Sequence, residues 1–237
     1  MFSFRLPLIA LGVSLAFAVP AQTSRGNVEF VTLAKEKTES REITVSVPRF
    51  RITGPLKSTA ENAARAFANE QLADFREIFK DGDVGPGPKF LQATPVVATA
   101  HAQLVSFRYD VSTYTGGAHP NSFTKVFNYG VVNRRAKSLT LSDLLLRGKR
   151  AADLTQKVLI PAINRAKKER GGDPASSLSV EQVNAFVIHS QGLTWHFSPY
   201  ELGPYAEGGY EIKLTWEQMK GYIDPAGLVR FARGSAR

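Results

Sequence analysis

QLVSFRYDVSTYTGGAHPNSFTKVFNYGVV, residues 103–132, consists of two runs rich in Val, Phe, Tyr and Thr around a short loop with two adjacent glycines. β-Branched and aromatic residues in runs of this length are typical of strands. Strands that follow each other through a short loop pair in antiparallel fashion. The stretch therefore predicts two adjacent antiparallel strands, at 103–113 and 122–132.

The segments on either side continue this pattern. Apolar residues at spacings of three and four predict helices at 57–80 and 151–170, the second interrupted at Pro161. Neighbouring strands joined by short turns indicate an α+β fold, with antiparallel sheets and helices packed on one face. Further strands are predicted from β-type runs and alternating apolar residues at 28–33, 42–52, 95–100, 186–189, 193–197 and 210–214.

A run of glycine, proline and aspartate, DGDVGPGP at 81–88, follows the first helix. Residues of this kind end helices and form connections. We expect the run to separate a strand–helix module at 22–88 from a larger module at 89–237, with the two packed closely together.

The N-terminus has the pattern of a secretory signal peptide at 1–21. Arg5 precedes an apolar stretch at 6–18, which is shorter than the ~20 residues of a membrane span. We expect cleavage after Ala21 and export to the periplasm or the cell exterior. The chain has no cysteine, which excludes disulfides, thiolate metal sites and a cysteine nucleophile.

The formal charge of +9 is concentrated in one stretch, 131–170, which has eleven basic and three acidic residues. Such a stretch either attracts an anionic envelope polymer or is simply a solvated helix face. Nucleic acid is not an expected partner, because the chain is exported and has no recognised nucleic-acid-binding motif. The basic residues expected to contact a polymer are Arg134, Arg135, Lys149, Arg150, Lys167 and Lys168.

Two motifs contain the candidate binding residues: YTGGAHPN at 114–121 and LTWHFSPYELGPYAEG at 193–208. Glycine and proline fix the loop of each motif, and tyrosines with polar tips are common where proteins bind partners or sugars. Strand alternation should send Trp195 and Phe197 inward and His196 to the other face. The predicted binding face comprises Tyr114, Gly116, Gly117, His119, Asn121, Tyr200, Glu201, Tyr205 and Glu207.

A catalytic or metal role is a weaker interpretation of the same residues. His119, His196 and Glu201 have the ligand types of a zinc centre and would form one only if the two loops meet. The alternative is that His119 bonds its own loop and His196 lies on a solvated strand face. The chain has no nucleophile elbow, Walker loop or H-E-x-x-H motif. We therefore predict no catalytic residue, metal or cofactor.

The YTGGAH loop, the LTLSDLL segment at 139–145 and the FSPYELGPYAEG stretch together resemble the RsiV-like C-terminal domain family over about 95–228. Residues 43–79 resemble the PdaC-type N-terminal module, a strand ending near a proline followed by a long amphipathic helix. The resemblance implies an envelope-facing domain that binds lysozyme. A basic lysozyme would need a local acidic patch on this basic chain, for which Glu201, Glu207 and Glu211 are candidates.

We expect an exported cell-envelope binding protein whose partner is a lysozyme-like protein or the wall polymer. An anti-sigma role is not expected, because only residues 1–5 precede the apolar stretch and no sigma-factor-binding segment fits there. Two alternatives remain: an enzyme that acts on an envelope glycan through His119, and an adaptor that holds anionic polymers. Deacetylation is not expected, because the Asp/His metal motif of polysaccharide deacetylases is absent.

Overall fold

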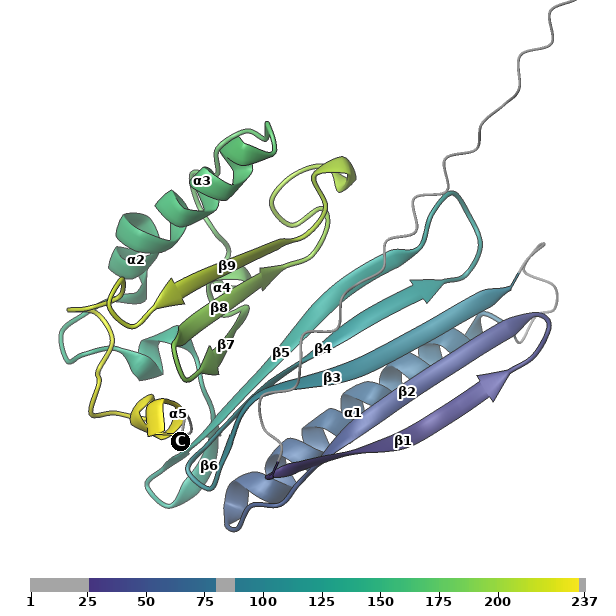
Figure 1. The fold of residues 1–237 in the computed structure, drawn as a ribbon, viewed down its shortest axis with the longest axis horizontal. Coiled ribbons are helices and arrows are strands. Elements are labelled where there is room, and N and C mark those ends of the chain that lie inside the picture. Colours follow the sequence, from purple (N-terminus) through teal and green to yellow (C-terminus); the bar gives the residue numbers. More distant parts are fainter. Residues whose placement is uncertain (1–25, 80–87, 235–237) are drawn as a thin grey trace, which may run out of the picture.

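The computed structural model describes residues 26–79 and 88–234, which form two sheets with a few helices (Figure 1). The predicted signal peptide and most of the run at 81–88 lie outside the described residues. The large sheet has the order β1 (Val28–Lys37), β2 (Arg41–Phe50), β3 (Lys89–His101), β4 (Leu104–Tyr114), β5 (Asn121–Val132), β6 (Arg135–Ser138). The small sheet has the order β7 (Phe186–His189), β8 (Gly192–Phe197), β9 (Tyr210–Thr215).

The α+β prediction is confirmed, but the large sheet is mixed rather than purely antiparallel. β2 and β3 pair in parallel, whereas the other neighbours pair antiparallel. The parallel pair arises because the long helix α1 (Pro55–Glu77) connects the two strands. The helix carries the chain back to the end of the sheet at which β2 began, so β3 runs in the same direction as β2. Parallel neighbours require such a crossover.

Helix α1 covers one face of the large sheet (Figure 1). It begins at Pro55 after Gly54, two residues before the expected start at 57. Proline fits the first helical position, because the N–H that it lacks would have no partner within the helix there. Its buried side chains pack against β2 to β5, and the core between them combines residues from both sides of position 88.

The helix expected at 151–170 is divided into α2 (Ala151–Leu154), a π-helical turn η2 (Thr155–Leu159) and α3 (Ile160–Glu169). The N–H of Ile160 bonds to the carbonyl of Thr155, five residues earlier. Pro161 cannot donate such a bond, so the expected interruption takes the form of a wider turn just before it. The remaining short helices are η1 (Leu141–Leu144), α4 (Val180–Val183), η3 (Tyr205–Glu207) and α5 (Arg230–Arg233). Among the described residues, no helix is long and apolar enough to cross a membrane.

The small sheet stands on the face of the large sheet opposite α1, and buried side chains satisfy the free edge of β7. Asn128 Nδ2 donates to the carbonyl of Phe186 at 2.7 Å. Ser106 Oγ accepts from the N–H of Ile188 at 2.7 Å and lies 2.7 Å from Asn128 Oδ1, to which it donates. Thr99 Oγ1 donates to the carbonyl of Ile188 at 2.7 Å. An edge strand that would otherwise expose backbone groups is thereby fixed in place.

Candidate functional site

The loops of the two motifs meet in space. The rings of His119 and Tyr205 stack with their centroids 4.0 Å apart, and the Tyr205 hydroxyl donates to the carbonyl of Pro120 at 3.1 Å. Tyr200 extends the group, because its ring lies 5.4 Å from that of Tyr205. We call His119, Tyr200 and Tyr205 the aromatic face. It joins the β4–β5 loop of the large sheet to the β8–β9 loop of the small sheet.

The β4–β5 loop is held by its own hydrogen bonds. The Tyr114 hydroxyl donates to the carbonyl of Gly117 at 2.9 Å, and His119 Nδ1 lies 2.9 Å from the carbonyl oxygen of the next residue. Gly116 and Gly117 have φ values of 104° and 109°, a region that other residues avoid. Tyr114 therefore supports the loop, whereas His119 and Asn121 are exposed.

Tyr200 combines exposure with backbone strain. Its φ is 73°, and its side chain is 64% exposed. The left-handed region costs an L-residue roughly 1–2 kcal/mol, and glycine avoids this cost. A large apolar ring held outward in such a conformation is an outlier of the kind that clusters at functional sites.

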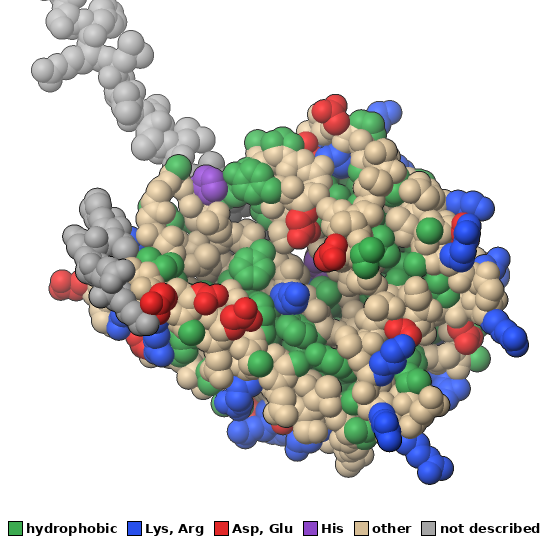
Figure 2. Space-filling view, turned by 180° about the vertical axis from the view of Figure 1, so that it is seen from behind, with side chains coloured by type: hydrophobic (Ala, Val, Ile, Leu, Met, Phe, Trp, Pro, Cys, Tyr) green, Lys and Arg blue, Asp and Glu red, His purple; other side chains and the backbone are tan. Residues whose placement is uncertain are grey.

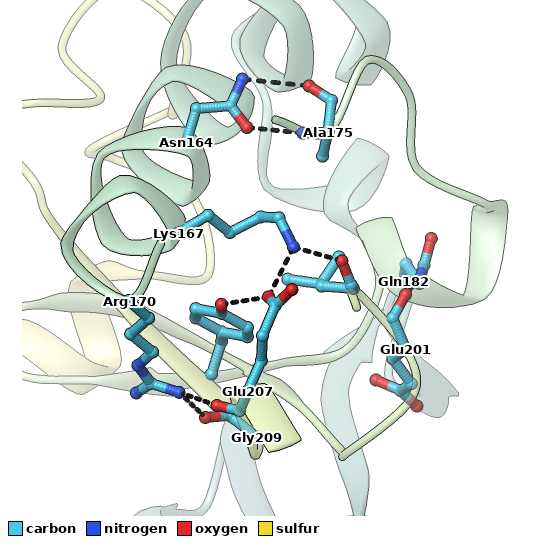
Figure 3. A network of polar contacts seen from close by, with 10 residues as sticks. Asn164, Lys167, Arg170, Ala175, Gln182, Glu201, Glu207 and Gly209 are labelled. Carbon is cyan, nitrogen blue, oxygen red and sulfur yellow. Dashed lines mark hydrogen bonds and ion pairs between the residues drawn. The ribbon is translucent and has the colours of Figure 1, made fainter. Parts of the chain in front are cut away.

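Glu207, a predicted binding residue, is instead the centre of a structural network (Figure 3). Lys167 of α3 is buried, and its Nζ donates to Glu207 Oε2 at 2.8 Å and to the carbonyl of Leu202. The Tyr210 hydroxyl donates to the same carboxylate oxygen. The hydrogen bond from Lys167, with a second from Tyr210, lowers the pKa of Glu207, whereas burial and then the carboxylate raise the pKa of Tyr210 to about 12.

Arg170 fixes the end of the same loop. Its Nη1 donates to the carbonyls of Glu207 and Gly209 at 2.7 Å each, and its guanidinium lies 4.2 Å from the ring centroid of Tyr210. A Cβ on Gly203 would lie about 2.5 Å from the Glu207 carboxylate, so the loop closes tightly over this group. Helix α3 therefore holds the loop that presents Tyr200 and Tyr205.

Substituting Lys167 with methionine is expected to lower the melting temperature by roughly 5 °C, because it leaves the Glu207 carboxylate without its cationic partner in a crowded site. Lys168→Met is the matched control, since Lys168 is the next residue of α3 and is exposed. Differential scanning calorimetry of both variants tests the difference. Equal melting temperatures would contradict a structural role for the ion pair.

The acidic patch expected around the second motif is largely neutralised. Besides Glu207, Glu211 lies 2.7 Å from Lys213, which places a positive charge beside it. Glu201 Oε2 accepts from the N–H of Ser198 at 2.9 Å, and burial raises the pKa of Glu201. These carboxylates therefore offer little uncompensated charge to a basic partner.

His196 is buried between the sheets rather than on the solvated face that one interpretation allowed. It is 8% exposed, because β8 is the central strand of the small sheet and is covered on both faces. Its Nδ1 lies 3.8 Å from Glu211 Oε2, and its Nε2 has no hydrogen-bond partner among the described residues. Burial lowers its pKa to about 4. Trp195 and Phe197 are buried, as predicted.

The metal interpretation gains no geometric support. His119 stacks on Tyr205, His196 is buried near Glu211, and Glu201 bonds the backbone of Ser198. Within residues 26–79 and 88–234, no group of three His, Asp or Glu side chains is placed to hold a metal ion.

The six basic residues expected to contact a polymer differ in their surroundings. On the face drawn in Figure 2, Lys and Arg side chains lie mainly around the rim. Lys167 is buried, and Arg150 pairs with Asp153 at 2.8 Å. Lys149 lies 5.7 Å from the ring centroid of Tyr222. Of the six expected polymer contacts, Lys167 is not accessible in this structure, whereas Arg134, Arg135 and Lys168 are exposed on separate elements.

Comparisons with known families match the two parts of the chain separately. Residues 34–122 match the family described as Deacetylase PdaC, and residues 142–217 match the one described as Protein of unknown function (DUF3298). The two matches lie one after the other along the chain, and each covers less than half of it. The PdaC match confirms that part of the resemblance and extends it from 43–79 to 34–122, which includes β3 and β4.

The peptidoglycan-N-acetylmuramic acid deacetylase PdaC of Bacillus subtilis is 24% identical over 222 residues. The alignment covers 88% of this chain but only 45% of that protein, so the chain spans about half the length of this relative. Two crystal structures of DUF3298 family proteins share the fold. The protein from Pseudomonas aeruginosa has a TM-score of 0.55 at 21% identity, covering 84% of this chain and 94% of that one. The protein from Bacteroides fragilis has a TM-score of 0.56 at 18% identity, covering 87% and 98%.

Proposed function

We propose that the chain is an exported binding module of the cell envelope and that its aromatic face binds the glycan of peptidoglycan. The observation that carries the proposal is the stack of His119, Tyr205 and exposed Tyr200 where the two loops meet. Sugars present apolar C–H faces and polar hydroxyls, which suits rings with an apolar body and a polar tip. The name of the B. subtilis relative, a peptidoglycan deacetylase, supports the choice of polymer.

Binding is favoured over catalysis by the contacts of His119. Its Nδ1 lies against a backbone carbonyl, and its ring face lies on Tyr205. Both contacts hold the imidazole in place as part of the binding surface. A general base instead needs a partner that tunes its pKa and a reacting proton within reach.

Tyr200→Gly tests the proposal. The substitution removes the exposed ring and also relieves the left-handed backbone, so the free energy of unfolding is expected to stay equal or rise by about 1 kcal/mol. Sedimentation with insoluble peptidoglycan is expected to show roughly tenfold weaker binding, in line with a residue that dominates an interface. Val180→Ala, on the neighbouring helix α4, is the matched control. Unchanged binding by the glycine variant would refute the proposal.

A lysozyme-like protein is the second candidate partner. Val180 is 73% exposed, and α4 is joined to the Tyr200 loop because Gln182 Nε2 donates to the carbonyl of Glu201 at 2.7 Å. Val180 and Tyr200 are thus two exposed apolar side chains on adjacent segments, which suits a protein partner. Glu181 adds a negative charge beside them, which suits a partner whose contact surface is positively charged. Calorimetric titration with a c-type lysozyme tests this candidate. Saturable heat that is lost in both Tyr200→Gly and Val180→Asp would favour it over the glycan.

A further inference from the structure

The face of the large sheet opposite α1 includes a group of small polar side chains, bordered by the apolar pair Phe90–Tyr114 and by Val96 and Val126. Ile43, Val45, Phe107 and Val111 point to α1 and are buried, so their neighbours along each strand point to the other face. The small sheet covers this face near Ser106 and Asn128, and the end of β8 reaches the face as far as Thr124. The remainder is partly exposed.

The strand register aligns these side chains in rows. Thr44 lies beside Gln92, Gln92 beside Ser112, and Ser112 beside Ser122, so one row crosses β2 to β5. Directly paired residues of neighbouring strands share a face of the sheet. Four strands at ~4.8 Å spacing give the row a length of roughly 15 Å.

A second row runs alongside the first. It consists of Thr94, Asp110 and Thr124, and the Thr124 hydroxyl lies 3.3 Å from Asp110 Oδ1, to which it donates. Arg108 neutralises Asp110 through two hydrogen bonds of 2.8 and 3.0 Å. The rows therefore offer hydroxyl and amide groups with a compensated charge pair.

The rows border the aromatic face. The N–H of Thr124 donates to Ser198 Oγ at 3.2 Å, which fixes the start of the Tyr200 loop to β5. Tyr114, the last residue of β4, follows the first row and precedes the glycine loop. Its ring centroid lies 6.2 Å from that of Phe90. A long ligand bound to the aromatic face could therefore also contact the two rows of polar side chains.

We propose that this polar face is the second half of the glycan site and holds an extended, uncharged sugar chain of several N-acetylated residues. The inference rests on the proposed function and adds the ligand's length and charge. An apolar partner would require an apolar face here, because buried hydroxyls without partners are costly. A polyanion would require uncompensated basic side chains. A chain rich in hydroxyl and amide groups matches the side chains present.

Calorimetric titration with soluble N-acetylglucosamine oligomers of two and six sugars tests the inference. The double variant Gln92→Ala, Ser112→Ala is expected to weaken binding of the six-sugar oligomer about tenfold and to leave the two-sugar oligomer unaffected. Binding of the longer oligomer is expected to be the same in 0.5 M salt, because the contacts are uncharged. Asn69→Ala, an exposed amide on α1 across the sheet, is the matched control.

The outcomes separate this inference from the proposed function. Loss of both oligomers in Tyr200→Gly, with loss of only the longer one in the double variant, supports both. Full binding of the longer oligomer by the double variant overturns the extended site and leaves the aromatic face standing. No binding of either oligomer or of insoluble peptidoglycan by the unmodified protein overturns both.

Discussion

Replacing Asn128 with leucine is expected to lower the free energy of unfolding by about 3 kcal/mol. Asn128 is 5% exposed and lies where the small sheet stands on the large one. Leucine has a similar size but removes the Nδ2 donor to the carbonyl of Phe186 and the acceptor of the hydrogen bond that the Ser106 hydroxyl donates. Each buried group left unsatisfied costs roughly 1–3 kcal/mol.

Chemical denaturation with urea measures this effect. Asn121→Leu is the matched control, because Asn121 starts the same strand but is exposed, and its change is expected within about 0.5 kcal/mol. The leucine variant is also expected to raise amide exchange at Ile188, whose N–H bonds to Ser106. If both leucine variants unfold at the same urea concentration, the buried contacts do not hold the small sheet in place.

The periodicity of the sequence predicted most strands, and a specific physical reason explains what it missed. Alternation reports which residues face inward but not which strand lies beside another. The parallel pair of β2 and β3 depends on the path of α1, which no local pattern encodes. Similarly, Ser106 and Asn128 occupy polar positions that resemble a solvated face until a second sheet covers them.

The candidate site was predicted in part. The glycine loop and the tyrosine loop do meet, and they meet through His119 and Tyr205, two residues named from the motifs. Lys167 and Glu207 were both interpreted as surface groups, because charged residues are rarely buried. The structure pairs them at 2.8 Å across 40 residues of chain, a contact that sequence spacing does not reveal.

Acidification is expected to destabilise the protein through His196. Its pKa in the folded chain is about 4, against an ordinary value of 6.5, because burial disfavours the charged ring. The positive charges of Arg108 and Lys213 also disfavour protonation of His196, whereas the carboxylates of Glu211 and Asp110 favour it. Between these two pKa values the unfolded chain binds more protons than the folded one, so stability falls as the pH drops from about 6.5 towards 4.

The expected loss is about 2 kcal/mol between pH 7 and pH 4.5, since one pKa unit corresponds to about 1.4 kcal/mol. His196→Gln removes the titrating group and keeps a polar side chain of similar length, so this variant is expected to lose about 2 kcal/mol less over the same range. His119→Gln, an exposed histidine, is the matched control and should follow the unmodified protein. His189 and Glu211 add pH dependence of the same sign, because burial lowers the pKa of His189 and Lys213 lowers that of Glu211 against the effect of burial. His189 is unchanged in the glutamine variant, whereas the charge of His196 also lowers the pKa of Glu211. The difference between the urea denaturation curves of the two proteins therefore reports His196 together with its effect on Glu211, and identical losses would show that the ring of His196 is solvated.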